Sequence, residues 1–160
     1  MMNFYRFLSF LLIPVGVFFA FITLFGLLLA LGNLSVLLSV FMTGATTIYI
    51  FTSFSFLNKS LVNRRPSAAR LFDWIRVNGF VAGIFSTLLI VQGLMFFLNP
   101  QLQQMLLDQM KSMQVADLSE SLIIKTLKVI LTLFVIIGAA ILVHVMLTFR
   151  LLKKHREMFQ

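Results

Sequence analysis

Four long apolar runs, separated by short polar segments, dominate the pattern of residues along the chain. None of the runs contains Asp, Glu, Lys or Arg, and they cover Phe7 to Leu31, Leu34 to Leu57, Val77 to Leu98 and Val129 to Phe149. Each run reaches the roughly 20 residues that a helix needs to cross the hydrocarbon of a bilayer. The pattern predicts an all-α integral membrane protein, a bundle of four transmembrane helices in a single domain over residues 1–160.

Turn and capping residues between the runs predict where the helices end. Gly32 and Asn33 are turn formers that can reverse a chain in minimal length, so the first two helices should form a tight hairpin. Asn99 has the character of a helix cap before a first-turn proline, and Asp117 with Glu120 resembles a capping box. We expect membrane helices at about residues 7–31, 34–57, 67–98 and 118–154.

The connector between the third and fourth helices carries apolar residues at helical spacing, namely Leu102, Met105, Leu106, Met110 and Met113. Such spacing is typical of a helix with one apolar face. We therefore expect a short amphipathic helix at about residues 100–114, lying on the outer surface of the membrane.

The composition agrees with a membrane protein and excludes several kinds of chemistry. Hydrophobic residues make up 60% of the chain and charged residues 11%, against roughly 45–50% and 25% in soluble proteins. The absence of cysteine excludes thiolate catalysis, disulfide exchange and cysteine-bound zinc or iron–sulfur clusters in this chain. Because no carboxylate lies in any apolar run, we expect no catalytic residue, metal site or cofactor, and no enzymatic activity.

Positive charge is unevenly distributed along the chain, which has thirteen Lys and Arg, five Asp and Glu, and a formal net charge of +8. Most basic residues fall in the N-terminal segment, the connector after the second helix and the C-terminal tail: Arg6, Lys59, Arg64, Arg65, Arg70, Arg76, Arg150, Lys153, Lys154 and Arg156. Only Lys111, Lys125 and Lys128 fall on the other side of the predicted membrane. By the positive-inside rule both termini face the cytoplasm. We expect a bacterial inner (cytoplasmic) membrane, membrane lipids as partners, and no nucleic acid.

Small residues at three-and-four spacing on two helices predict close helix packing. The second helix carries Ser35, Ser39, Thr43 and Thr46, and the third carries Gly79, Gly83, Ser86 and Gly93. Within lipid, helices associate where small side chains let their backbones approach. We expect the two stripes to face each other inside one bundle; the alternative is that one stripe binds another subunit.

Three polar side chains stand out within the predicted spans, where an unpartnered polar group is costly. His144 and Asn78 should lie at similar depth near the cytoplasmic side, and Gln92 in the outer half. We expect His144 to hydrogen-bond a neighbouring helix, with Asn78 as one possible partner; a proton relay, pH sensing and haem ligation are the functional alternatives. For Gln92 we expect an interhelical hydrogen bond.

The basic surface on the cytoplasmic side has two interpretations. Its charges either serve only as the topology signal or contact anionic lipid headgroups or the acidic surface of a partner. The residues concerned are Arg64, Arg65, Arg70, Arg150, Lys153, Lys154 and Arg156.

These features favour an accessory or structural subunit of a larger membrane complex, acting through helix–helix and membrane-surface contacts with other membrane subunits. The alternative is a protein that binds or transports a lipid or hydrophobic small molecule in an intramembrane cavity near Asn78 and His144. A third possibility is an enzyme or redox subunit completed by a partner. A closed bundle is expected of an accessory subunit, and a lateral opening of a lipid binder.

Overall fold

The computed structural model describes residues 2–66, 68–112 and 120–158. Its long elements are the helices α1 (Met2–Ala30), α2 (Leu37–Phe56), α3 (Ala69–Leu98), α4 (Pro100–Ser112) and α5 (Glu120–Lys154). Three short segments extend or follow them: the 3-10 turns η1 (Leu34–Val36) and η3 (Arg156–Met158), and the π-helical turn η2 (Leu57–Val62).

Within the described ranges, four helical segments are long and apolar enough to cross a membrane: α1, the segment Leu34–Val62 that contains α2, α3, and α5. This finding confirms four long apolar helices of spanning length and indicates an integral membrane protein. Two boundaries differ from the prediction. The first helix begins at Met2 and the second continues through η2 to Val62, so both extend beyond the apolar runs. The predicted capping residue Asp117 and the start of the last helix at 118 lie outside the described residues.

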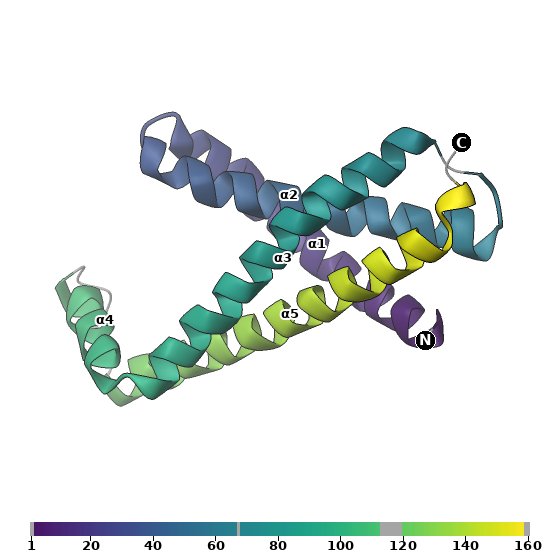
Figure 1. The fold of residues 1–160 in the computed structure, drawn as a ribbon. Helices are drawn as coiled ribbons and strands as arrows, with labels where there is room; N and C mark the ends of the chain where they lie inside the picture. The colour runs from purple at the N-terminus through teal and green to yellow at the C-terminus, as the bar shows by residue number, and fades with distance from the viewer. Residues whose placement is uncertain (1, 67, 113–119, 159–160) are drawn as a thin grey trace.

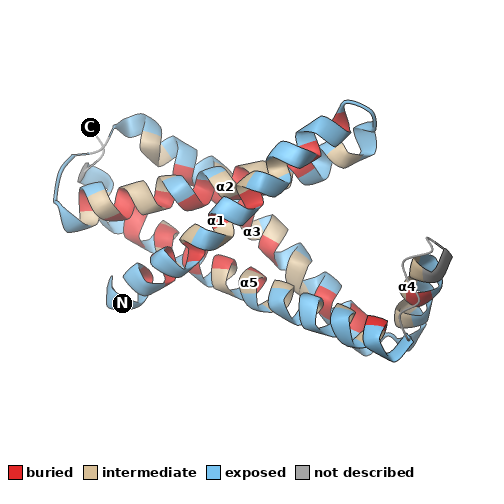
Figure 2. Ribbon diagram, turned by 180° about the vertical axis from the view of Figure 1, so that it is seen from behind, coloured by how far each residue is buried: buried red, intermediate tan, exposed pale blue. Residues whose placement is uncertain are grey.

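The helices form two hairpins, α1 with α2 and α3 with α5, which together make an open V (Figure 1). Both termini and the connector from α2 to α3 lie at one end of the molecule, here called the terminal end. The turn between α1 and α2 and helix α4 lie at the other end, the distal end. The hairpins pack together toward the terminal end and diverge toward the distal end. Figure 2 shows many of the buried residues where the two hairpins meet.

Asparagine side chains cap the two distal turns, as the sequence indicated for Asn99. The Asn99 Oδ1 atom accepts hydrogen bonds from the backbone N–H groups of Gln101 at 3.0 Å and Leu102 at 3.3 Å. Asn33 Oδ1 accepts from the backbone N–H of Ser35 at 3.0 Å. These bonds satisfy N–H groups that the first turn of a helix leaves without partners.

Close contacts at glycines hold each hairpin together. A Cβ atom built on Gly138 of α5 would lie 2.9 Å from the backbone oxygen of Ser86 on α3, and Gly93 of α3 packs directly against Val135 of α5. In the other hairpin, a Cβ on Gly16 would lie 2.9 Å from the Ile50 side chain. Small residues therefore act within each hairpin, as expected for helices packing in lipid.

The prediction that the small-residue stripes of α2 and α3 face each other is wrong along most of their length. Ser86 and Gly93 of α3 lie against α5, and Gly79 lies between Phe149 of α5 and Tyr49 of α2. On α2, the Thr43 hydroxyl lies 3.1 Å from that of Thr23 on α1. Of the other residues of this stripe, Thr46 is buried, whereas Ser39 of α2 and Ser35 of η1 are exposed. Each stripe thus faces mainly its own hairpin partner, because the sequence pattern indicates a close contact without identifying the helix that makes it.

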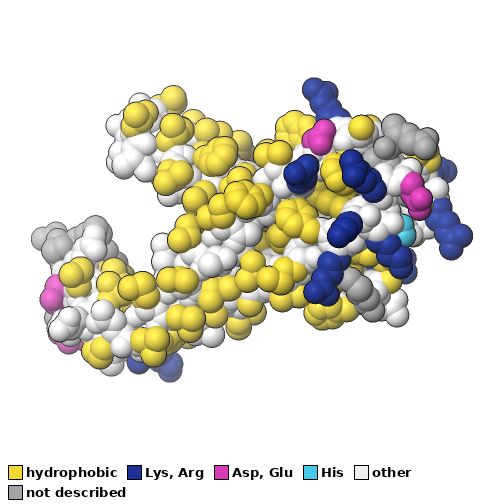
Figure 3. Space-filling view, viewed as in Figure 1, with side chains coloured by type: hydrophobic (Ala, Val, Ile, Leu, Met, Phe, Trp, Pro, Cys, Tyr) yellow, Lys and Arg dark blue, Asp and Glu magenta, His cyan; other side chains and the backbone are white. Residues whose placement is uncertain are grey.

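Most of the Lys and Arg side chains in view gather around the terminal end of the molecule, and a smaller group lies near the distal end (Figure 3). The residues singled out as lipid or partner contacts are all exposed: Arg64, Arg65, Arg70, Arg150, Lys153, Lys154 and Arg156. The asymmetry of charge along the sequence is therefore also an asymmetry in space.

We expect Gly138→Ala to destabilise the protein, because its new methyl group would meet backbone that moves only if α3 and α5 separate. Overpacking of this kind costs about 1–3 kcal/mol. Gly83→Ala is the matched control, since the nearest atom to its Cβ, in Val145, is 3.9 Å away and alanine favours a helix by about 1 kcal/mol over glycine. Thermal unfolding in mild detergent followed by circular dichroism should show a lower midpoint for the first variant only.

Candidate functional site

The main polar feature inside the described spans is a cluster around His144 of α5. The His144 side chain is only 1% exposed. Its Nε2 atom lies 2.9 Å from the Ser9 hydroxyl of α1, and its Nδ1 atom lies 2.8 Å from the Tyr49 hydroxyl of α2. Both ring nitrogens therefore have a partner, and each partner comes from a different helix.

Further hydrogen bonds extend this cluster into a connected network. The Tyr49 hydroxyl also lies 2.8 Å from the Thr148 hydroxyl, and the Tyr5 hydroxyl lies 3.3 Å from the same Thr148 oxygen. The Ser9 and Thr148 hydroxyls each reach a backbone oxygen one helical turn earlier, Ser9 that of Tyr5 and Thr148 that of His144. The network joins α1, α2 and α5. We call the five side chains Tyr5, Ser9, Tyr49, His144 and Thr148 the polar clamp.

Two aromatic rings enclose the imidazole. The Tyr5 ring stacks on His144 with ring centroids 4.8 Å apart and planes at 10°, and the Tyr49 ring meets it edge-on at 5.6 Å and 71°. Aromatic pairs in such arrangements are worth about 0.5–1.5 kcal/mol beyond the area they bury. The rings also keep the hydrogen-bonded nitrogens away from lipid.

The clamp suits a neutral histidine that carries its proton on Nε2. The Ser9 hydroxyl has one hydrogen and donates it to the Tyr5 backbone oxygen, so it accepts from Nε2–H, and Nδ1 accepts from the Tyr49 hydroxyl. No buried side-chain nitrogen or oxygen within the described residues lacks a hydrogen-bond partner. A fully satisfied and enclosed network of this kind rigidifies a structure, so the geometry favours the simplest expectation for His144, an interhelical hydrogen-bonding residue.

Sequence reasoning identified His144 but missed Tyr5, Ser9 and Tyr49. Tyr5 precedes the first apolar run and so fell outside the predicted span, whereas Ser9 and Tyr49 are single weakly polar residues inside the runs. The available signal was the four-residue spacing of Tyr5 and Ser9, which places both on one face of a helix.

The other two polar candidates lie away from the clamp. The Asn78 side-chain amide donates to the backbone oxygen of Trp74 at 2.8 Å, and no hydrogen bond between described residues joins it to His144, whose ring nitrogens bind Ser9 and Tyr49. Gln92 of α3 is exposed on the outside of its hairpin. The expected interhelical hydrogen bond of Gln92 is not among those that the described side chains make.

A second feature, the interhairpin groove, lies along α1 and α2 on the side that reaches α3. It has a volume of about 760 Å³ and is lined by Thr23, Leu27, Leu34, Leu37, Leu38, Val40, Phe41, Gly44, Ala45, Ile48 and Asn78. Thr23 and Asn78 are the polar members of this lining, and Asn78 is the one from α3. The groove is thus apolar along its length, with an amide at the end where the hairpins meet.

Comparison with known proteins gives no further guide to the site. No protein-family model matches the chain, and neither curated proteins nor solved structures show significant similarity to it. Among the described residues, no group of three or more His, Cys, Asp or Glu side chains could hold a metal ion.

Removing the Tyr49 hydroxyl should weaken the clamp more than removing that of Tyr5. Tyr49→Phe deletes two contacts of 2.8 Å and leaves His144 Nδ1 without its partner. An unsatisfied buried group costs about 1–3 kcal/mol. Tyr5→Phe keeps the stacked ring and loses only a contact of 3.3 Å, which should cost less than about 1 kcal/mol.

The measurement is the unfolding midpoint of both variants in a denaturing-detergent titration. Equal midpoints for the two variants would show that the hydrogen bonds of Tyr49 do not hold the hairpins together.

Proposed function

We propose that the protein binds a lipid or another hydrophobic small molecule inside the membrane, in the interhairpin groove. The observation that carries this proposal is the groove itself, about 760 Å³ in volume and lined by α1 and α2 together with Asn78 of α3. The hairpins diverge from this level toward the distal end (Figure 1). A closed bundle was expected of an accessory subunit, and the open form favours the binding alternative.

The lining of the groove supports an apolar ligand with one polar group. Its volume of about 760 Å³ lies within the roughly 300–1,000 Å³ of small-molecule sites, which are mostly apolar with a few placed polar groups. The small side chains of Gly44 and Ala45 leave room in the groove, and Asn78 offers an amide at its inner end. Binding here requires no catalytic group, in keeping with the expectation of a non-enzymatic protein.

The sequence analysis placed the alternative cavity near both Asn78 and His144, and the groove proposed here includes only Asn78. The proposed cavity lies beside Asn78, whereas His144 is enclosed in the polar clamp and does not line the groove. The clamp holds the inner ends of the hairpins and so sets the shape of the groove.

We also infer that the terminal end faces the cytoplasm, in a bacterial inner membrane. The support is the gathering of Lys and Arg around that end (Figure 3), combined with the excess of basic residues in cytoplasmic connectors. Helix α4 would then lie at the outer surface. Its Leu107 side chain is buried, and the Gln103 side-chain amide donates a hydrogen bond to the backbone oxygen of Phe96 at 2.9 Å, which holds α4 to the end of α3.

Filling the groove should remove the bound molecule. Ile48→Trp adds bulk at the wall near Asn78, whereas Leu24→Trp adds the same bulk on the exposed face of α1 outside the groove lining. Native mass spectrometry after purification in mild detergent should show a retained apolar molecule with the unmodified protein and with Leu24→Trp. Its occupancy should fall several-fold with Ile48→Trp.

The proposal would be contradicted by two results. One is an unmodified protein that retains no apolar molecule, and the other is equal retention by both tryptophan variants.

A second candidate function, the accessory subunit, is favoured by Gln92. This amide faces outward in the distal half of α3, where no described side chain satisfies it. An amide exposed to hydrocarbon is stabilised by about 1 kcal/mol when another helix supplies a hydrogen bond. A partner subunit packed on this face would provide that bond.

If a partner binds there, Gln92→Leu should reduce its recovery without affecting the chain itself. The tagged protein would be purified from its native membrane in mild detergent, and co-purified chains quantified by mass spectrometry. We expect several-fold less partner with the variant and an unchanged unfolding midpoint for the isolated chain. A protein that purifies without other chains in both forms would rule out this second function.

A further inference from the structure

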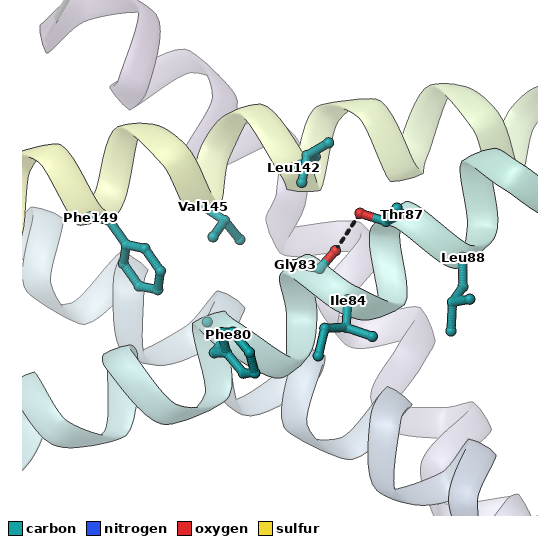
Figure 4. A pocket seen from close by; sticks show the side chains of 9 residues that line it. Phe80, Gly83, Ile84, Thr87, Leu88, Leu142, Val145 and Phe149 are labelled. Carbon is teal, nitrogen blue, oxygen red and sulfur yellow. Dashed lines mark hydrogen bonds between the residues drawn. The ribbon is translucent and has the colours of Figure 1, made fainter.

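A second groove runs along the opposite flank of α3, between α3 and α5. Its volume is about 360 Å³, and its lining is almost entirely apolar: Gly79, Phe80, Gly83, Ile84, Thr87, Leu88, Leu142, Val145 and Phe149. Figure 4 shows Phe80, Ile84 and Leu88 on α3 and Leu142, Val145 and Phe149 on α5. The Thr87 hydroxyl is turned back to the Gly83 backbone oxygen at 2.9 Å, so it offers no free donor.

Glycine makes this groove possible. A Cβ atom on Gly83 would find its nearest neighbour, in Val145, 3.9 Å away, so α3 and α5 are less tightly packed here than at Gly138. The outer side of the groove is open, since Phe80, Ile84 and Leu88 are all exposed. A narrow apolar slot of this kind suits an extended hydrocarbon chain.

At the terminal end the slot continues into a basic pocket. This pocket has a volume of about 400 Å³ and is lined by Phe72, Arg76, Phe149, Leu152, Lys153 and Arg156. Phe149 lines both hollows, which makes them neighbours along one face of the α3–α5 hairpin. From Arg76 to Leu88 the face extends about 18 Å along the helix axis.

The three cations of this pocket have no ion-pair partner among the residues that the structure describes. Arg76, Lys153 and Arg156 come from α3, α5 and η3, and none of them forms a hydrogen bond or ion pair with another side chain that the structure describes. Three positive charges in one pocket whose described lining contains no carboxylate favour an anionic ligand. Only Lys153 and Arg156 were among the basic residues predicted as lipid contacts; Arg76 joins them through the packing of α3 against α5.

We propose that this face is a binding site for an anionic phospholipid of the leaflet at the terminal end. Its phosphate contacts Arg76, Lys153 and Arg156, and one acyl chain occupies the slot past Gly83. Basic pockets between transmembrane helices on the cytoplasmic side recognise anionic headgroups in this way. A soluble anion would leave the apolar slot empty, and an acidic protein segment would not enter the hydrocarbon.

This site is separate from the interhairpin groove and does not depend on the function proposed for it. Asn78 lines the interhairpin groove and Phe80 lines the α3–α5 slot. Residues two positions apart on a helix point about 200° apart, so the two hollows lie on opposite flanks of α3. Variants at one site leave the lining of the other intact.

The test uses a single tryptophan beside the slot as a reporter of lipid contact. Trp74, the single tryptophan of the chain, is replaced in the double variant Trp74→Phe with Val91→Trp. Val91 is exposed, lies one helical turn beyond Leu88 and is outside the slot lining. The protein is reconstituted in phosphatidylcholine vesicles. Brominated phosphatidylglycerol or brominated phosphatidylcholine is then titrated over the same range of mole fractions, at constant ionic strength. We expect the anionic lipid to quench the fluorescence at a several-fold lower mole fraction.

Charge variants separate a specific pocket from general attraction to a basic surface. Arg76→Gln with Lys153→Gln removes two cations of the pocket, and Arg65→Gln with Lys154→Gln removes two exposed cations outside its lining. The preference for the anionic lipid should disappear in the first pair and persist in the second, with circular dichroism showing that both are folded.

Three results would overturn the proposal. The first is equal quenching by the two brominated lipids, and the second is an equal loss of preference in both charge variants. The third is loss of the preference when inorganic phosphate replaces chloride at equal ionic strength. That loss would identify a free anion as the ligand.

Discussion

The hydrogen bonds of His144 are the interaction on which the arrangement of the helices depends. An imidazole in hydrocarbon needs partners for both nitrogens, because no water is present to supply them. Here one partner is Ser9 of α1 and the other Tyr49 of α2, with Thr148 completing the network on α5. No two of these helices satisfy the ring alone, so both hairpins must meet at this level of the membrane.

The open shape of the rest of the molecule follows from where this interaction lies. Each hairpin is held along its length by its own glycine contacts, such as Gly16 with Ile50 and Gly138 with Ser86. The polar clamp joins the hairpins toward the terminal end, and toward the distal end they diverge (Figure 1). Helix α3 is consequently flanked by two hollows, an apolar groove toward α2 and a slot with a basic mouth toward α5. Both proposed ligand sites are consequences of this one geometry.

The sequence predicted what depends on local pattern. The four spans followed from the length of the uncharged runs, and the cap at Asn99 from the residue types around it. The sequence did not predict which helices touch, because spacing shows that Gly93 belongs to a close contact without showing that Val135 is the neighbour. The sequence also placed Asn78 and His144 at a similar depth in the membrane. A similar depth does not show on which face of its helix each residue lies, so it could not predict whether the two make contact.

The polar clamp shows the same limit for the candidate site. His144 was evident as the one histidine of the four runs, but Tyr5 and Ser9 are brought to it by the path of α1 across α5. Similarly, Arg76 is distant in sequence from Lys153 and becomes its neighbour only when α3 packs against α5. Constellations assembled from separate helices need a structure before they can be recognised.

The central claim, that the clamp joins the hairpins at one end and leaves them apart at the other, can be measured directly in a bilayer. Because the chain has no cysteine, spin labels can be attached at single introduced cysteines on α1 and α5. Double electron–electron resonance would compare the pair Arg6→Cys and Arg150→Cys near the clamp with the pair Leu29→Cys and Leu122→Cys at the distal end. We predict a clearly longer distance for the distal pair. Similar distances for the two pairs would show a closed, parallel bundle and contradict the account.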